Sequence, residues 1–242
     1  MLTDLAWPVV LLIGLVVTLG AYVQAVVGLG LGLLGAPIVA LVDPSLVPVL
    51  TLWLALLISG LNLFGEHEHI DWRATAWSLP ARVPGTVVGA WLVVVFTEEQ
   101  IGVVLAVMVL LAVGLSVHTL EVPVNPVTLA TAGFVAGTTG TATSIGGPPV
   151  ALLYQRRDPQ VARATMSVFF FVGVILSLIG LTMSGSLARE PSLLALVTSP
   201  GVLVGFVVGR HTRNLIDGEV FRRGVLVVCA VSAVILLVRS MV

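Results

Sequence analysis

The sequence contains no lysine, and its 11 basic residues are all arginines. Charged residues make up only 10% of the 242 positions, whereas a typical soluble domain carries about 25%. No basic run is long enough to follow a phosphate backbone, so nucleic acid is not an expected partner. Hydrophobic residues reach 58%, and the mean hydropathy is +1.14. This composition is that of a polytopic membrane protein.

Several motifs of catalysis are also missing from the chain. Cys229 is the single cysteine, which excludes an internal disulfide and a cysteine-based metal site. There is no G-x-x-x-x-G-K-[ST] loop for ATP, no G-x-S-x-G, no H-E-x-x-H and no pair of acidic residues within an apolar run. The alternation Glu66-His67-Glu68-His69 is more typical of a solvated loop than of a metal site. We therefore expect no metal, no cofactor and no enzymatic activity.

Two apolar stretches are predicted to be broken helices. Residues 5–42 would measure about 57 Å as one helix, whereas the hydrocarbon core is about 30 Å thick, and a glycine-rich run precedes Pro37. Residues 127–155 contain Gly146-Gly147-Pro148-Pro149, which cannot belong to a continuous membrane helix. The remaining apolar runs predict membrane spans at 46–64, 74–96, 100–118, 163–184, 192–209 and 221–240.

The two halves of the chain share short motifs in the same order. The pairs are Gly35-Ala36-Pro37 with Gly147-Pro148-Pro149, Asp43-Pro44 with Asp158-Pro159, and Pro84-Gly85 with Pro200-Gly201. The glycine and proline that membrane helices commonly carry explain one such match more easily than three. We therefore predict an all-α protein with two homologous halves, residues 1–120 and 121–242. Each half would contain a broken, re-entrant helix pair followed by three transmembrane helices.

Loops flanked by arginines indicate the orientation. Arg156, Arg157 and Arg163 flank one such loop, and arginine-rich loops are typically cytoplasmic. Re-entrant hairpins would make the halves inverted repeats and would place Arg73 inside, whereas single crossings would make the halves parallel and place Arg73 outside. The excess length of residues 5–42 and the charge distribution favour the inverted arrangement. Either arrangement puts both chain termini on the non-cytoplasmic side.

The breaks themselves are candidates for an anion site. Irregular backbone persists at membrane depth only where it is buried in protein or lines a wet cavity, and a helix N-terminus offers positive charge and unpaired N–H groups. We expect short helices after Pro37 and Pro149 to begin near the midplane, so that valine at Gly35 or Gly147 would abolish transport. Hydroxyl residues also pack helices together, and this remains the alternative for each threonine. The expected contact residues are Gly32, Gly35, Thr141, Thr143, Ser144, Gly146 and Gly147, with Thr138 and Thr139 as further hydroxyl donors.

Arg82 is the one charged residue in the span from 76 to 96. An ionisable side chain inside a membrane segment typically faces a partner or a transport pathway, and a guanidinium can bind two oxygens of an oxyanion. The alternative is that Arg82 snorkels to the interface near Arg73. Gln24 and Asn62 are further candidates for contact with the anion, although a hydrogen bond between helices is the more common role for a lone amide.

The glycine- and proline-based motifs resemble those of the sulfite exporter TauE/SafE family of bacterial membrane proteins. The resemblance lies in Val27–Gly32 followed by Gly35-Ala36-Pro37, in Gly146-Gly147-Pro148-Pro149, and in the Pro-Gly-x-x-x-Gly spans. It covers essentially the whole chain. It implies transport of sulfite, sulfoacetate or a related sulfur-containing anion across the cytoplasmic membrane.

The hypothesis from the sequence is therefore a secondary transporter that exports a small sulfur oxyanion or organosulfonate. Its partners would be the anion and the lipid bilayer, and the energy would come from an ion gradient, with the proton as the coupling ion, or from the gradient of the anion. The sequence leaves open whether the chain works alone or as a homodimer. The alternatives are an importer of another small organic or inorganic anion, an intramembrane enzyme, and a passive assembly subunit.

Overall fold

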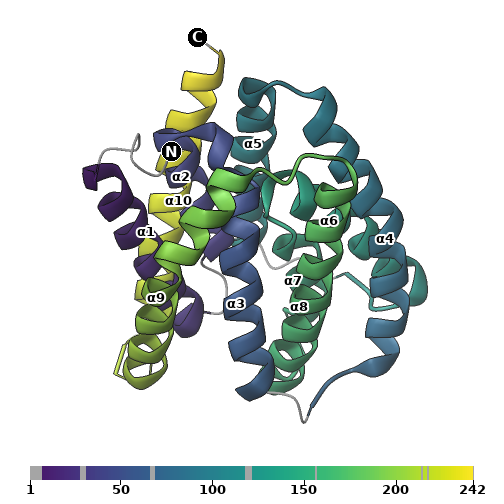
Figure 1. The fold of residues 1–242 in the computed structure, drawn as a ribbon. Helices are drawn as coiled ribbons and strands as arrows, with labels where there is room; N and C mark the ends of the chain where they lie inside the picture. Colours follow the sequence, from purple (N-terminus) through teal and green to yellow (C-terminus); the bar gives the residue numbers. More distant parts are fainter. Residues whose placement is uncertain are drawn as a thin grey trace.

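The computed structural model describes residues 7–27, 31–65, 69–117, 122–155, 157–213, 215–216 and 218–241, and the regular structure within these residues is helical (Figure 1). The helices of the first half are α1 (Trp7–Val27), the π-helix η1 (Leu31–Gly35), α2 (Ala36–Val42), the 3-10 helix η2 (Pro44–Leu46), α3 (Val49–Gly65), α4 (Trp72–Val95) and α5 (Glu98–Val117). The helices of the second half are α6 (Pro126–Thr143), α7 (Gly147–Tyr154), α8 (Pro159–Met183), α9 (Arg189–Thr212) and α10 (Gly218–Met241).

The predicted fold class is confirmed. Six of the described helices, α1, α4, α5, α8, α9 and α10, are long and apolar enough to cross a membrane, and α3 is an apolar helix of 17 residues. The outer faces of these helices remain apolar, since side chains such as Leu11, Val87, Leu196 and Val227 are well exposed. Exposed aliphatic side chains on every side are what a lipid environment requires of a helical bundle. The chain is a multi-pass membrane protein.

The first break lies further towards the N-terminus than the sequence indicated. The α-helix α2 begins at Ala36 with Pro37 in its first turn, but η1 leads into it without a gap from Leu31, so the helical segment begins earlier than the expected start after Pro37. The backbone N–H of Leu31 donates to Oε1 of Gln24 at 2.9 Å, which satisfies one of the unpaired donors of the helix start. Gly28 and Gly30, which carry part of the motif, lie outside the described residues.

The second break falls where it was predicted. α6 ends at Thr143, and Ser144 adopts a left-handed backbone conformation with φ of 59°. α7 then begins at Gly147, with prolines in its first turn, where a missing N–H costs nothing. The reversal makes a hairpin, because α7 packs back on α6.

The two breaks lie against each other inside the bundle. A Cβ on Gly32 would lie 3.1 Å from the carbonyl oxygen of Ser144. The hydroxyl of Thr51 in α3 donates to Oγ of Ser144 at 2.7 Å. The structure therefore joins, at one place, two segments more than a hundred residues apart in the chain.

Glycines allow two helix pairs to pack in close contact. In the α4–α6 pair, a Cβ on Gly85 would collide with the carbonyl group of Phe134, and one on Gly133 would collide with that of Ser78. In the α1–α9 pair, a Cβ on Gly205 would collide with the carbonyl oxygen of Thr18. Small residues at such contacts are what brings membrane helices together, because the solvent supplies no hydrophobic drive between them.

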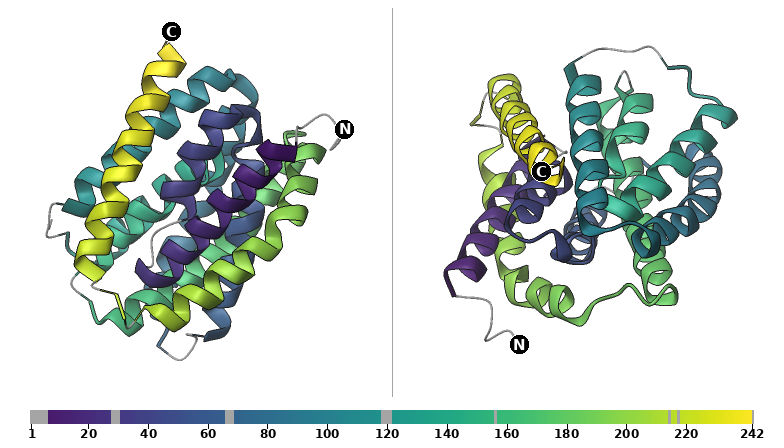
Figure 2. Two further views of the ribbon diagram at one scale, coloured as in Figure 1. Left: turned by 90° about the vertical axis from the view of Figure 1, so that its left-hand side faces the viewer. Right: turned by 90° about the horizontal axis from the view of Figure 1, so that it is seen from above.

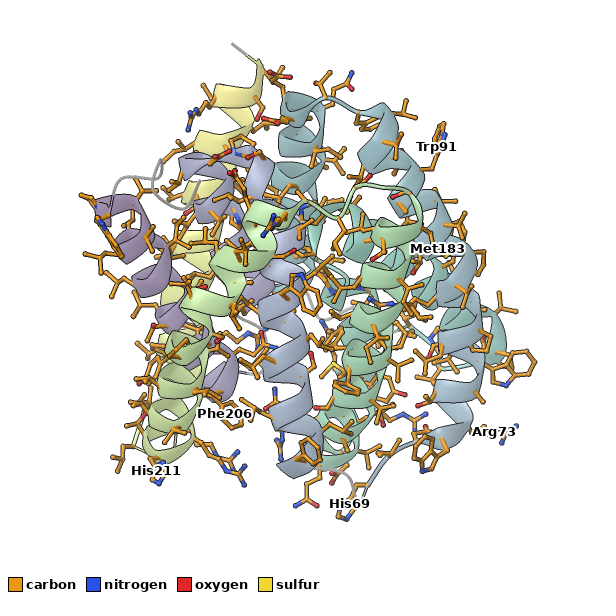
Figure 3. The ribbon with its side chains drawn as sticks, viewed as in Figure 1. His69, Arg73, Trp91, Met183, Phe206 and His211 are labelled. Carbon is orange, nitrogen blue, oxygen red and sulfur yellow. The ribbon has the colours of Figure 1, made fainter. Side chains whose placement is uncertain are left out.

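The remaining helices complete the bundle around these pairs. α10 packs against α5, and α3 packs against α8. The left view of Figure 2 shows α10, in yellow, along one side of the bundle. Figure 3 places His69, Arg73 and His211 at one end of the bundle and Trp91 and Met183 towards the other. α4 thus begins at the end where α9 finishes, and the two helices run in opposite directions. The inverted two-fold relation of residues 1–120 and 121–242 remains a prediction.

Candidate anion site

A small cavity of about 70 Å³, named here the inner cavity, lies where the two helix breaks meet. Six of its lining residues were candidates from the sequence: Gln24, Gly32, Arg82, Ser144, Gly146 and Gly147. The others are mainly apolar and come chiefly from α3 and α8: Leu33, Leu52, Ala55, Ser59, Gly140, Ile145, Pro148, Phe170 and Val174. Candidates that are far apart in the sequence thus line one cavity.

The Arg82 side chain is inside the bundle and does not snorkel to the interface. Only 1% of Arg82 is exposed. Its guanidinium carbon lies 4.7 Å from the centre of the Phe169 ring, a distance at which a cation is attracted to the ring face. Nε and Nη1 of Arg82 are buried without a hydrogen-bond partner among the described residues.

Glycines of neighbouring helices make room for the Arg82 guanidinium. A Cβ on Gly173, one turn after Phe169 in α8, would overlap the guanidinium carbon, Nε and Nη1. On the α6 side, a Cβ on Gly140 would lie 3.2 Å from Nη2 and equally close to the Cα of Gly146. The guanidinium therefore fits between the backbones of two helices, and its position depends on residues that carry no side chain.

The charge of Arg82 makes the inner cavity suited to an anion. Burying a cation without a counter-ion costs several kcal/mol, even after relaxation. Thr86, one turn further along α4, also has a buried hydroxyl without a partner among the described residues. Arg82 therefore brings hydrogen-bond donors to the inner cavity that have no partner among the described residues, whereas Thr86 does not line this cavity.

The start of α7 adds backbone polarity to the same wall. Gly146 has a φ of −99° and a ψ of 0° and precedes the first turn, whose N–H groups have no partner within the helix. Pro148 and Pro149 have no N–H, so Gly146, Gly147 and Val150 are the amide donors near this end. A Cβ on Gly146 would lie 2.7 Å from the carbonyl oxygen of Ala136, so this close backbone approach requires glycine.

Other sequence candidates have different roles in the structure. Thr141 is fully buried and its hydroxyl lies 2.8 Å from that of Ser177, which links α6 to α8. Thr143 donates to the carbonyl oxygen of Thr139 at 2.8 Å. Thr138 and Thr139 likewise donate to carbonyls one turn earlier in α6.

Gly35 does not line the inner cavity. Its backbone is helical, with φ of −71° and ψ of −46°, and a Cβ there would meet nothing within 4 Å. Neither a strained φ nor a close backbone contact therefore supports the expected loss of transport on substitution of Gly35 by valine, which remains a prediction. The helix has already resumed four residues earlier, at Leu31.

A larger cavity of about 660 Å³, named here the vestibule, adjoins the inner cavity. Gln24, Ser59 and Phe170 line both of them, and the candidate Asn62 lines the vestibule. Its other walls carry five arginines: Arg157, Arg163, Arg210, Arg213 and Arg222. The described residues that line it include no aspartate or glutamate.

Sequence reasoning missed several residues of the site. Phe169, Phe170 and Gly173 lie in a continuous apolar run, and nothing in the local pattern separates them from lipid-facing residues. Ser59 was hidden for the same reason. The signal that could have identified Gly173 is its spacing from Phe169 by one helical turn. This spacing places an aromatic ring and a position without a side chain next to each other on one face of the helix.

The apolar bundle defines a multi-pass membrane protein, and the cavity beside Arg82 and the helix breaks is its candidate anion site. The model of the sulfite exporter TauE/SafE family matches residues 10–236. The chain belongs to this family.

A curated relative covers most of the chain as well. The probable sulfite/organosulfonate exporter TauE of Cupriavidus necator is 28% identical over 216 residues, which are 83% of this chain and 83% of that protein. No solved structure matches the chain.

Proposed function

We propose that the protein is a secondary transporter that exports sulfite or a related small sulfur-containing anion, including organosulfonates. Membership of the TauE/SafE family supports this proposal, as does the name of the relative from Cupriavidus necator. The observation that carries it is the buried Arg82 guanidinium beside a cavity between two helix breaks, because its Nε and Nη1 have no hydrogen-bond partner among the described residues.

In the proposed site, Arg82 supplies the charge and the helix breaks supply the shape. Charge-assisted N–H···O bonds from a guanidinium to an oxyanion are about twice as strong as neutral ones. The ring of Phe169 and the backbone of Gly173 hold the plane of the guanidinium. The cavity volume of about 70 Å³ admits a small anion group, so the organic part of a larger sulfonate would extend towards the vestibule.

Transport requires that the site open alternately to the two sides of the membrane. We propose that residues 1–120 and 121–242 form inverted repeats, and that the α1–α9 and α4–α6 pairs, each of which joins the two halves, rock about the inner cavity. The packing of the helices supports the inverted arrangement, since α1 of the first half packs on α9 and α6 of the second half packs on α4. These glycine-packed pairs would move as units, because any separation would lose their close contacts.

A proton gradient is the coupling we propose alongside the gradient of the anion. The described residues that line the inner cavity include no aspartate, glutamate or histidine. A proton exchanged for the exported anion would therefore be carried by a group outside these described lining residues. We place the protein in the bacterial cytoplasmic membrane with both termini on the non-cytoplasmic side, and we propose no catalytic step.

Counterflow of labelled sulfite in proteoliposomes tests the function. Vesicles preloaded with unlabelled sulfite should accumulate labelled sulfite transiently, and an Arg82→Gln variant should not do so at equal protein density. Competition with sulfoacetate and with a carboxylate of similar size would define the substrate class. If labelled sulfite does not accumulate while another small anion does, the assignment of a sulfur anion is wrong.

A further inference from the structure

The vestibule has a charge that the inner cavity does not explain. Five arginines from α8, α9, α10 and the segment after α7 line it, whereas a single arginine lines the inner cavity. Arginine-rich loops follow from membrane topology alone, but topology does not require these side chains to surround a cavity of about 660 Å³.

Among the described residues, two aspartates near the arginine-lined end act as helix caps, and their carboxylates lie outside the lining of the vestibule. Asp71 accepts a hydrogen bond from the N–H of Ala74 and caps α4. Asp158 accepts from the N–H of Gln160 at 2.8 Å and caps α8. Neither aspartate lines the vestibule. The Arg222 side chain donates to the carbonyl oxygen of Ser116, a neutral partner that leaves its charge in place.

The vestibule also adjoins the proposed binding site. Gln24, Ser59 and Phe170 form a shared boundary with the inner cavity. An anion that enters at the arginine-lined end therefore passes several cationic side chains before it reaches Arg82. Clefts of one sign of charge between low-dielectric walls focus the field and raise the local concentration of counter-ions.

We propose that the vestibule is an outer anion site that collects oxyanions and sulfonates and loads the inner cavity from the arginine-lined end. It acts through the summed charge of its arginines rather than through a fixed set of hydrogen bonds. The identity of the transported anion rests on the proposed function, whereas the attraction of anions to the vestibule does not.

A cysteine placed in the vestibule measures this attraction without any transport assay. Asn62 is partly exposed, lines the vestibule and is suitable for substitution as Asn62→Cys. Its thiolate would attack a methanethiosulfonate reagent, forming a mixed disulfide and releasing methanesulfinate. The two reagents to compare carry a sulfonate or a trimethylammonium group. The unsubstituted chain gives the background, since Cys229 is 1% exposed.

The sulfonate reagent should react about tenfold faster than the cationic one at low salt, after each rate is divided by its rate with a free thiol. Adding Arg157→Gln and Arg213→Gln, which removes two of the five charges, should lower this ratio towards one. Salt well above about 0.1 M, where the Debye length is about 10 Å, should do the same. Arg189→Gln is the matched control, because Arg189 begins α9 and Arg213 follows its end.

Transport kinetics supply the second measurement. Arg157→Gln with Arg213→Gln should raise the KM for anion entering from the arginine-lined end at low salt and leave the maximal rate unchanged. Equal reaction rates of the two reagents at low salt would overturn the outer site. If the sulfonate preference holds but the unsubstituted protein does not transport sulfite, the proposed function fails and the outer site stands.

Discussion

At the scale of single residues, Arg82 is held in place by the absence of neighbouring side chains. Gly173 and Gly140 leave the space that its guanidinium fills, and Phe169 covers it. An arginine is long and flexible, and without this confinement it would reach water at the membrane surface. The glycines therefore determine where the charge of the site lies.

Gly173→Ala is expected to weaken sulfite binding at least about tenfold, which corresponds to about 1.4 kcal/mol. The added Cβ would overlap the guanidinium, so the charge must move away from the cavity. Alanine is the better helix former, so α8 itself should remain folded. Titration of sulfite into purified protein measures the affinity.

Gly114→Ala is the matched control for that substitution. Gly114 also lies inside a membrane helix, but a Cβ there meets nothing within 4 Å, and sulfite affinity should not change. If the sulfite affinity of the Gly173→Ala protein is also unchanged, the Arg82 guanidinium can bind the anion from a position other than the one beside Gly173.

The sequence predicted Arg82 but not the residues that hold it. A lone charge in an apolar span is conspicuous because burying it is costly. Gly173 is one of 25 glycines, and only the packed structure shows which of them lies beneath a cation. The sequence likewise does not show whether a threonine hydroxyl of α6 faces the anion. Threonine can equally donate to a carbonyl of its own helix, as Thr138, Thr139 and Thr143 do.

At the scale of elements, the two breaks differ in how they are built. The second reverses the chain through Ser144 in a left-handed conformation and restarts at a Gly-Pro-Pro sequence. The first resumes at Leu31, where Gln24 satisfies the N–H, and passes through a π-helix into α2. A π-helical turn in a membrane protein frequently marks a functional site.

Gly146→Ala should impair both folding and transport, whereas Gly35→Ala should be tolerated. A Cβ on Gly146 would lie 2.7 Å from the carbonyl oxygen of Ala136, and one on Gly35 would meet nothing. The measurements are the thermal unfolding midpoint in detergent and counterflow at matched abundance. A loss of transport in Gly35→Ala without loss of the folded protein would mean that Gly35 acts in another transport state.

The spans were predictable because their apolar runs have the length of a bilayer. The position of the first break was not predictable. A proline can be recognised in a sequence, whereas the hydrogen bond from Leu31 to the side chain of Gln24, seven residues earlier, cannot. Pro37 was taken as the helix start, but a proline is also tolerated within the first turn of a helical segment that continues from a π-turn. The local sequence thus indicated a break in the first apolar stretch. It did not indicate that the helical segment after this break begins at Leu31 rather than at Pro37.

At the scale of the whole molecule, the start of α1 at Trp7 and the end of α10 at Met241 lie on the side opposite Arg73 and His211 (Figures 1 and 3). If the arginine-lined end faces the cytoplasm, a reporter fused after residue 242 is exported. An alkaline phosphatase fusion should therefore be active and a green fluorescent protein fusion dark in a bacterial cell. The reverse pattern would invert the orientation and make the vestibule an entrance from outside.

The central claim is that the inner cavity binds a sulfur oxyanion through Arg82. The most direct measurement is the equilibrium affinity of purified protein for sulfite, compared among the unsubstituted chain, Arg82→Gln and the control Arg189→Gln. Loss of the charge-assisted bonds, worth about 1.5–3 kcal/mol each, should weaken binding about 100-fold in Arg82→Gln and leave Arg189→Gln unchanged. A folded Arg82→Gln protein that binds sulfite as tightly as the unsubstituted chain would contradict the claim.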